Sequence, residues 1–460
     1  MLDFLKSVLL ETKFPILLKY QRRTIRAFRV ENGVLKEASI RNLSGISIRV
    51  WNRGIWGFSS TGIMTKGAVE KAIKSAMEAV KGFEGKSQYH TPSFNPAKGD
   101  FRVTETDSVA LHSVEEKIDL VMRTADIAKK SEKIVSSLSF YSEIVDEKYF
   151  LSNYGTEASY HDVKVDFGVM AYASDGNRME MGFKTTGATG GWGELFRRNE
   201  PDFLAEEAAR VAIEKLGCNV PEGGIYTVIL HPSLVGVLAH EAIGHTVEAD
   251  LVISGSAAKG KIGEKVASEL VTLVDDPDPE IEKGASGILL VDDEGNLPQK
   301  VKIIENGVMK SYLHDSETAG MFSVSPTGNA RAFNYSDEPI IRMRNTYIAP
   351  GEQTLDEMIS ATRKGFYLKE LGGGGQADAN AEFMFGVQEA YRIENGKLKE
   401  PVKGITISGQ AFDVLRSVDM VGNDFQFALG SGYCGKHQPA KVDAGGPHIR
   451  CKVKIGGKKA

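Results

Sequence analysis

The feature of this 460-residue sequence that most constrains its fold is a change of pattern near residue 220. Before it, apolar residues at helical spacing alternate with strand-like stretches, whereas after Ile225 the pattern is mostly strand-like. The segment GCNVPEGG, residues 217–224, separates the two parts. We predict an α+β fold with a mixed α/β N-terminal domain over residues 1–220 and a β-rich C-terminal domain over 221–460. The first domain is long enough for two subdomains of about 1–100 and 101–220.

Local signals place three helices in the N-terminal part. Residues 66–82 carry one apolar stripe at helical spacing. Ser113 and Glu116 form a capping-box pattern, so a second helix should begin near Val114. A third runs from Pro201 to Gly217, because proline favours a helix start and glycine a helix end. Residues 135–190 are strand-like, and hairpin turns are expected at residues 31–33, 52–54, 305–307 and 394–396.

Charge and cysteine content narrow the class of protein. With 56 Lys plus Arg against 61 Asp plus Glu, the net charge of −5 lacks the broad basic field of a general nucleic-acid binder. The apolar opening, residues 1–20, is broken by charges and Pro15, so neither a membrane span nor a signal peptide is expected. The 3 cysteines are widely separated and suggest no disulfide framework. We therefore expect a cytoplasmic protein without direct nucleic-acid or membrane contacts.

One helical segment, residues 231–250, stands out in the C-terminal part and opens with Pro232 and Ser233. Its centre reads His-Glu-Ala-Ile-Gly-His, residues 240–245. In the common zinc-peptidase motif the two histidines are four residues apart, but here they are five apart. At about 100° per residue, a regular helix would leave them roughly 140° apart. A local π-type turn would bring them to nearly the same side, and Gly244 makes that distortion cheaper.

This motif has two interpretations. Either His240 and His245 bind a metal and Glu241 activates water, or all three are ordinary helix residues. A catalytic zinc site needs three protein ligands and one open position for water. The candidates for the third ligand are Glu248, Asp250, Cys434, His437 and His448. Cys434 lies in a glycine-framed loop and a thiolate suits zinc, whereas Cys218 and Cys451 are expected to be small buried hydrophobic residues.

Three segments of the chain resemble the TldD/PmbA family, also called modulators of DNA gyrase. They are HEAIGHTVEAD (240–250), the run from Gly372 to Gly409, and GSGYCGKHQPAKVDAGGPHIR (430–450). The resemblance covers residues 225–450 well and is weaker over the first 220. It implies a zinc metallopeptidase of the HExxxH type, TldD-like because the histidine motif is complete. The residues matching His240, His245 and Cys434 would bind Zn²⁺, and Glu241 would be the catalytic carboxylate.

The resemblance also implies a substrate and a partner. Substrates of the family are unfolded or flexible polypeptides and peptide precursors. The chain should act as a dimer, either a homodimer or a heterodimer with a PmbA/TldE-like partner, with the peptide cleft between the two chains. Glu241 would take a proton from the zinc-bound water and return it to the leaving amine. One departure from the family is His437, which stands where glycine is common.

The alternative function is a non-catalytic regulatory or binding subunit that contacts a partner through the β-rich part. Glu241 argues against it, because a binding module has no need of a carboxylate between two potential metal ligands.

Four other segments are expected to be structural. We expect the acidic residues 274–280 to form a solvated turn and His314 to Glu317 to form another turn. Arg331, Arg342 and Arg344 should line a cleft or an interface. Gly372–Gly375 should form a flexible loop or a place where a peptide adds as a strand.

Overall fold

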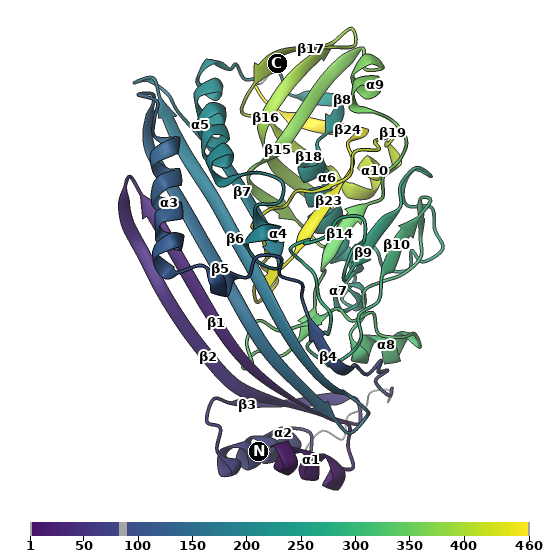
Figure 1. Cartoon of the computed structure of the whole chain (residues 1–460). Coiled ribbons are helices and arrows are strands. Elements are labelled where there is room, and N and C mark those ends of the chain that lie inside the picture. The colour runs from purple at the N-terminus through teal and green to yellow at the C-terminus, as the bar shows by residue number, and fades with distance from the viewer. Residues whose placement is uncertain (1, 82–89, 459–460) are drawn as a thin grey trace.

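The structure is a computed structural model that describes residues 2–81 and 90–458 (Figure 1). Its α-helices are α1 Leu2–Glu11, α2 Lys66–Ala79, α3 Val114–Ala128, α4 Trp192–Leu195, α5 Pro201–Gly217, α6 Pro232–Val237, α7 Ala249–Ile253, α8 Ser316–Phe322, α9 Leu355–Ser360 and α10 Ala411–Arg416. The α+β class predicted from the sequence is confirmed. No helix within the described ranges is long and apolar enough to cross a membrane.

The first sheet is built from long strands of the N-terminal part. Its strands are β1 Ile16–Glu31, β2 Val34–Asn52, β3 Ile55–Thr61, β4 Lys98–Arg102, β5 Ile134–Ser152, β6 Glu157–Ser174 and β7 Met179–Thr189. They lie in the order β3-β2-β1-β5-β6, with β4 and β7 both paired to β6. Only the β4–β6 pairing is parallel. The predicted β content of residues 135–190 is thereby confirmed.

Local signals for helices and turns hold in the structure. Ser113 and Glu116 form the capping box that begins α3, and Pro201 opens α5. The hairpin turns between β1 and β2, and between β16 (Glu382–Glu394) and β17 (Lys397–Val402), place Asn32 and Asn395 at φ 51° and 50°. Each of these asparagines is followed by a glycine that also has positive φ, which is the backbone that two-residue hairpin turns require.

Both faces of the first sheet are covered over its central strands, whereas residues 34–44 of β2 are largely exposed. Apolar residues of β6, such as Val165 and Phe167, share one core with Leu120 of α3 and Leu204 of α5. Figure 1 shows α3 along one face of the sheet and the C-terminal part beside the other. That other face carries charged side chains, and Lys148 of β5 contacts Asp293 of the C-terminal part at 2.9 Å. Because side chains of a strand alternate between faces, one face is apolar and the other polar.

The C-terminal part contains two larger sheets and two short strand pairs. One sheet has the order β11-β10-β9-β14-β23-β20 and consists of β9 Leu273–Asp276, β10 Val301–Glu305, β11 Val308–Met309, β14 Asn345–Ile348, β20 Gln426–Phe427 and β23 Asp443–Gly446. The short pairs are β12 Ala330–Arg331 with β13 Ile340–Ile341, and β21 Tyr433–Cys434 with β22 Ala440–Lys441.

The last sheet closes on itself. Its strands are β8 Gly224–Leu230, β15 Lys364–Ala377, β16 Glu382–Glu394, β17 Lys397–Val402, β18 Thr406–Gln410, β19 Met420–Val421 and β24 Ile449–Gly456. The order is β15-β8-β24-β18-β16-β17, and β15 also pairs with β16, which closes a ring of strands. Leu234 and Leu238, in and after α6, share one core with Phe366 and Phe385 of this ring. The segment that begins with α6 is therefore held in the core. The division of the chain at residue 220 stays a prediction.

Two acidic segments predicted as solvated turns are buried in part, although Asp278 and Glu280 are exposed. Asp275 of β9 is fully buried, and its carboxylate accepts hydrogen bonds from the backbone and side chain of Arg344, both at 2.8 Å. His314 is only 3% exposed, and the side chain of Asp315 caps α8. The prediction was wrong because pairing of β9 with β10 and β14 covers Asp275, and no local signal reports that pairing.

Two further predictions for the C-terminal part also need correction. Arg342 and Arg344 were expected to line a cleft or an interface, but both are 0% exposed and donate hydrogen bonds within the chain. Gly372–Gly375 was expected to form a loop, yet it lies within β15, where the register with β16 shifts between Leu371 and Gly375. A Cβ at Gly372 would lie 2.6 Å from the Val387 carbonyl carbon, so this glycine permits close packing of the two strands.

Candidate metal centre

The helical segment that begins with α6 changes its winding twice. A π-helical turn covers Leu238–Gly244 and a 3₁₀ turn covers His245–Val247, so the segment is not one regular helix over residues 231–250. The N–H of His245 donates to the carbonyl oxygen of His240, which is the hydrogen bond over five residues that defines a π turn. The π-type turn that the metal interpretation of the motif required is therefore present. A Cβ at Gly244 would lie 1.8 Å from the Met343 sulfur, so glycine fits there.

This turn brings the two histidines together beside Cys434 of β21. One potential ligand atom from each of His240, His245 and Cys434 lies within 4.8 Å of the other two. His245 Nε2 is 3.1 Å from Cys434 Sγ. His240 is 1% exposed, and neither of its ring nitrogens has a hydrogen-bond partner. A buried imidazole without a partner is costly, so this arrangement suits a ligand that is bound by both rings and the thiol.

Glu248 orients His245 from the opposite side of the ring. His245 Nδ1 lies 3.1 Å from Glu248 Oε2, and Glu248 is fully buried. The ammonium of Lys436 donates to Glu248 at 2.9 Å and to Asp250 at 2.6 Å. Metal-binding histidines usually donate their second ring N–H to a carboxylate in this way. Glu248 and Asp250, two candidates for the third ligand, therefore engage His245 and Lys436 instead.

A buried arginine anchors the loop that carries Cys434. The Arg342 guanidinium donates to the carbonyl oxygens of Cys434, Lys436 and Gln438. His437 in this loop has φ 56°, in the left-handed region that favours glycine. His437 thus occupies a backbone conformation that glycine adopts more readily than histidine.

The remaining candidates for a third ligand lie elsewhere. His437 is exposed. His448 is buried, with Nε2 3.0 Å from the Tyr367 hydroxyl and Nδ1 against the Asp424 carboxylate. Of the five candidates, only Cys434 joins the two histidines. Cys218 and Cys451 are buried, as predicted.

The electrostatics of the group favour a thiolate. Burial raises the pKa of the Cys434 thiol, but the neighbouring His240 and His245 imidazoles outweigh burial and lower this pKa to about 3. Burial lowers the pKa of His245, but the Glu248 carboxylate and Cys434 outweigh burial and raise it to about 10. In the absence of a metal, Cys434 and His245 are thus an ion pair at neutral pH. A thiolate is the form of cysteine that binds metals.

Glu241 lies at the solvent-facing side of this group. Its Oε2 is 3.6 Å from His245 Nε2, and 39% of its side chain is exposed. His245 is also partly exposed, whereas His240 and Cys434 are buried. The carboxylate is therefore close to His245, one of the three potential ligands, and open to solvent, which suits a base that acts on water.

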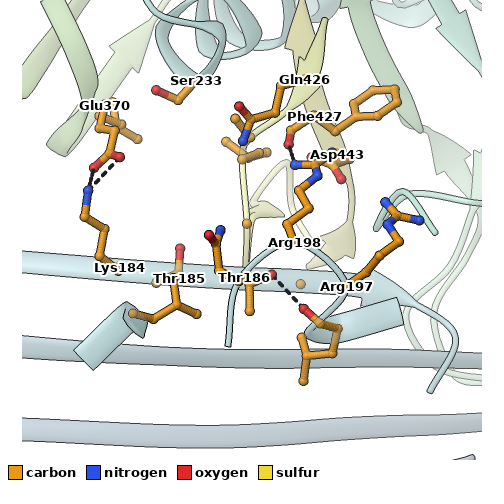
Figure 2. A pocket seen from close by; sticks show the side chains of 18 of the residues that line it. Lys184, Thr185, Thr186, Arg197, Arg198, Ser233, Glu370, Gln426, Phe427 and Asp443 are labelled. Atoms are coloured by element: carbon orange, nitrogen blue, oxygen red, sulfur yellow. Dashed lines mark hydrogen bonds and ion pairs between the residues drawn. The ribbon is translucent and has the colours of Figure 1, made fainter. Parts of the chain in front are cut away.

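A pocket of about 310 Å³ lies near the start of the same helical segment (Figure 2). Ser233 of α6 lines it together with residues of β7 and β15, and Lys184 pairs there with Glu370 at 2.6 Å. The Arg198 guanidinium donates to the Phe427 carbonyl oxygen at its other end. Sequence reasoning missed this pocket, because its lining comes from segments that are far apart in the chain and carry no shared motif. None of His240, Glu241, His245 and Cys434 lines it.

Family models match almost the whole chain. They are the models of the PmbA/TldA metallopeptidase domain 1, central domain and C-terminal domain, over residues 18–80, 108–216 and 223–457.

Curated relatives match over similar lengths. A metalloprotease of Methanothermobacter thermautotrophicus is 35% identical over 93% of this chain and 92% of its own. A zinc metalloprotease TldD homologue of Saccharolobus solfataricus is 33% identical over 90% of both chains. A metalloprotease TldD homologue of Haemophilus influenzae is 31% identical over 93% of this chain and 90% of its own.

Solved structures share the fold. A Thermotoga maritima protein that carries the name of a DNA gyrase modulator superposes with a TM-score of 0.80 over 99% of both chains, at 24% identity. TldE of Thermococcus kodakarensis superposes with a TM-score of 0.78 over 99% of this chain and 100% of its own, at 20% identity. The family models and the relatives show which family the chain belongs to, and the solved structures show that it shares their fold. It belongs to the PmbA/TldD family of metallopeptidases, and within that family it is of the TldD type.

Proposed function

We propose that this protein is a zinc metallopeptidase in which His240, His245 and Cys434 bind Zn²⁺ and Glu241 is the catalytic base. The observation that carries this proposal is the convergence of two imidazoles and a thiol within 4.8 Å, with both nitrogens of the buried His240 ring unpartnered. Two nitrogen ligands and one sulfur ligand suit zinc, and three protein ligands leave a fourth position open for water. A zinc metalloprotease is also the name of one relative.

The surrounding residues fit a bound zinc as well. Glu248 accepts the second ring N–H of His245, which leaves Nε2 free to face the metal. Arg342 anchors the Cys434 loop through its carbonyl oxygens. When bound, zinc supplies a Lewis acid that polarises the scissile carbonyl and lowers the pKa of water.

The reaction assigns Glu241 two proton transfers. As the attacking water adds to the scissile carbonyl carbon, the Glu241 carboxylate takes a proton from it. The protonated carboxyl then donates this proton to the nitrogen of the leaving amine, so the C–N bond breaks and the carboxylate is restored. The exposed side of Glu241 lets a peptide approach, whereas Glu248 is buried and paired with Lys436.

The substrate, partner and location follow from the family resemblance and remain part of the proposal. We expect hydrolysis of unfolded or flexible polypeptides, in a homodimer or in a heterodimer with a PmbA/TldE-like partner. We also expect a cytoplasmic location, and no direct contact with nucleic acid or membrane. Loss of activity in the isolated chain would therefore not contradict the proposal, because the partner chain could complete the cleft.

The test is a zinc count, which requires neither substrate nor partner. We expect one zinc per chain in the wild type after reloading, most of it lost in Cys434→Ser, and all of it kept in Glu241→Ala. Glu241→Ala should at the same time abolish hydrolysis of a flexible peptide, because ligand and base have separate roles. If the zinc-replete wild type binds no zinc, the peptidase proposal fails and a non-catalytic binding subunit becomes the better description.

A further inference from the structure

The polar face of the first sheet borders a small, partly open cavity against the C-terminal part. Its volume is about 40 Å³. Tyr433 and Ala440, of the β21–β22 hairpin that carries Cys434, line one side. Five cationic side chains line the cavity, and each of these residues is at most 8% exposed: Arg23, Lys148, Lys164, Arg331 and Lys441. Such a concentration of buried positive charge needs compensation.

Carboxylates compensate this charge only in part. Asp146 pairs with Arg23, Asp166 with Lys441, and Asp162 with Lys164. Asp293 is shared by two lysines, Lys148 at 2.9 Å and the buried Lys19 at 3.1 Å. Six cationic side chains thus meet four carboxylates, which leaves an excess of two positive charges.

Arg331 is the cation without a carboxylate. Across residues 2–81 and 90–458 no carboxylate oxygen forms an ion pair with it, and it donates one hydrogen bond, of 2.8 Å, to the Met343 carbonyl oxygen. Burial lowers the pKa of Arg331, and the neighbouring Arg342 guanidinium lowers it further. Burial also lowers the pKa of Lys164, to about 8. Burial is the largest cause of both shifts, and the Asp162 carboxylate offsets it only in part.

A second unpartnered group lies at the same cavity. Arg23 uses two nitrogens on Asp146, but its buried Nη1 has no hydrogen-bond partner. A buried guanidinium N–H normally has an acceptor, because leaving it unpaired costs about 1–3 kcal/mol or more. The cavity therefore combines excess positive charge with a buried N–H donor that lacks an acceptor.

We propose that this cavity binds one small monovalent anion, of the size of chloride. One water-sized sphere needs about 10–15 Å³, so the volume of about 40 Å³ admits a small ion. Arg23, Arg331 and the surrounding lysines would hold the anion between the first sheet and the hairpin of Cys434. The anion would thereby bridge the first sheet and the β21–β22 hairpin, which carries the proposed zinc ligand Cys434.

The first test is thermal stability of the full chain at constant ionic strength. Chloride is titrated against morpholinoethanesulfonate, an anion too large for the cavity. A ligand that binds only the folded state raises the melting temperature with the logarithm of its concentration. We expect about 2 °C for each tenfold increase in chloride. An equal melting temperature in both salts would overturn the proposal.

Two variants and a direct measurement localise the effect. Arg331→Met should abolish the chloride response, whereas Arg22→Met should keep it, because the Arg22 side chain on the same sheet is 60% exposed. A full response in Arg331→Met would mean that chloride acts elsewhere and the proposal is wrong. Crystals of the wild type soaked in bromide should show an anomalous peak in the cavity. This measurement holds even if the variant fails to fold, and an empty cavity there would refute the site.

Discussion

Replacing Glu248 by glutamine should weaken zinc binding without removing a proposed ligand. Glu248 is fully buried and its Oε2 lies 3.1 Å from His245 Nδ1. Glutamine keeps the shape but removes the negative charge that holds the ring in place. A hydrogen bond to a charged group contributes about 1.5–3 kcal/mol, and each 1.4 kcal/mol is a factor of ten in affinity. Glu248→Gln should therefore bind zinc about 10- to 100-fold more weakly.

The assay is a zinc titration against a chelator of known affinity, with Asp250→Asn as the matched control. Asp250 also accepts a hydrogen bond from Lys436, at 2.6 Å, but no hydrogen bond joins it to His245. We expect the control to bind zinc nearly as well as the wild type. Equal zinc affinity of Glu248→Gln and the wild type would refute the reasoning, because the carboxylate would then play no part in orienting His245.

Three further predictions follow from the same structure. Arg342→Lys should lower zinc affinity about tenfold and speed alkylation of Cys434 in the metal-free protein, because lysine cannot hold the carbonyl oxygens that the guanidinium holds. Gly236→Ala should destabilise the fold by about 1–3 kcal/mol in denaturant unfolding, since its Cβ would lie 2.5 Å from the Ala444 carbonyl carbon. Gly67→Ala, where a Cβ meets nothing within 4 Å, is the neutral control. Finally, the ultraviolet absorbance of the Cys434 thiolate in the metal-free protein should persist below pH 9 and disappear only toward about pH 3, because its pKa is lowered to about 3. A loss of this absorbance near pH 9 would contradict the ion pair with His245.

Much of the local structure could be predicted from the sequence. The capping box at Ser113 and the proline at the start of α5 act within one helical turn, so the residues themselves carry the signal. The same holds for the π turn between His240 and His245, because a five-residue spacing that serves one metal is incompatible with a regular helix. Because the π turn brings His240 and His245 to the same side of the segment, the two rings can face one metal.

Burial was the property that the sequence did not reveal. Asp275 and Arg344 were expected in a solvated turn and at a cleft, but they meet at 2.8 Å in the core. Their surroundings depend on the pairing of β9 with β14, which joins segments about seventy residues apart. The excess of buried cations around Arg331 depends likewise on which face of the first sheet meets the C-terminal part.

The sequence by itself determined the helix and hairpin positions, the π turn and the two histidines that share it, because these depend on interactions between near neighbours in the chain. The family resemblance implied Cys434 as the third ligand, but among the five candidate side chains only the tertiary structure shows which one joins those histidines. Cys434 lies 189 positions from His245 and yet 3.1 Å away, held there by the Arg342 contacts and the β21–β22 hairpin. Such a contact depends on how strands from distant segments pair and pack, and no periodicity or local motif encodes that choice.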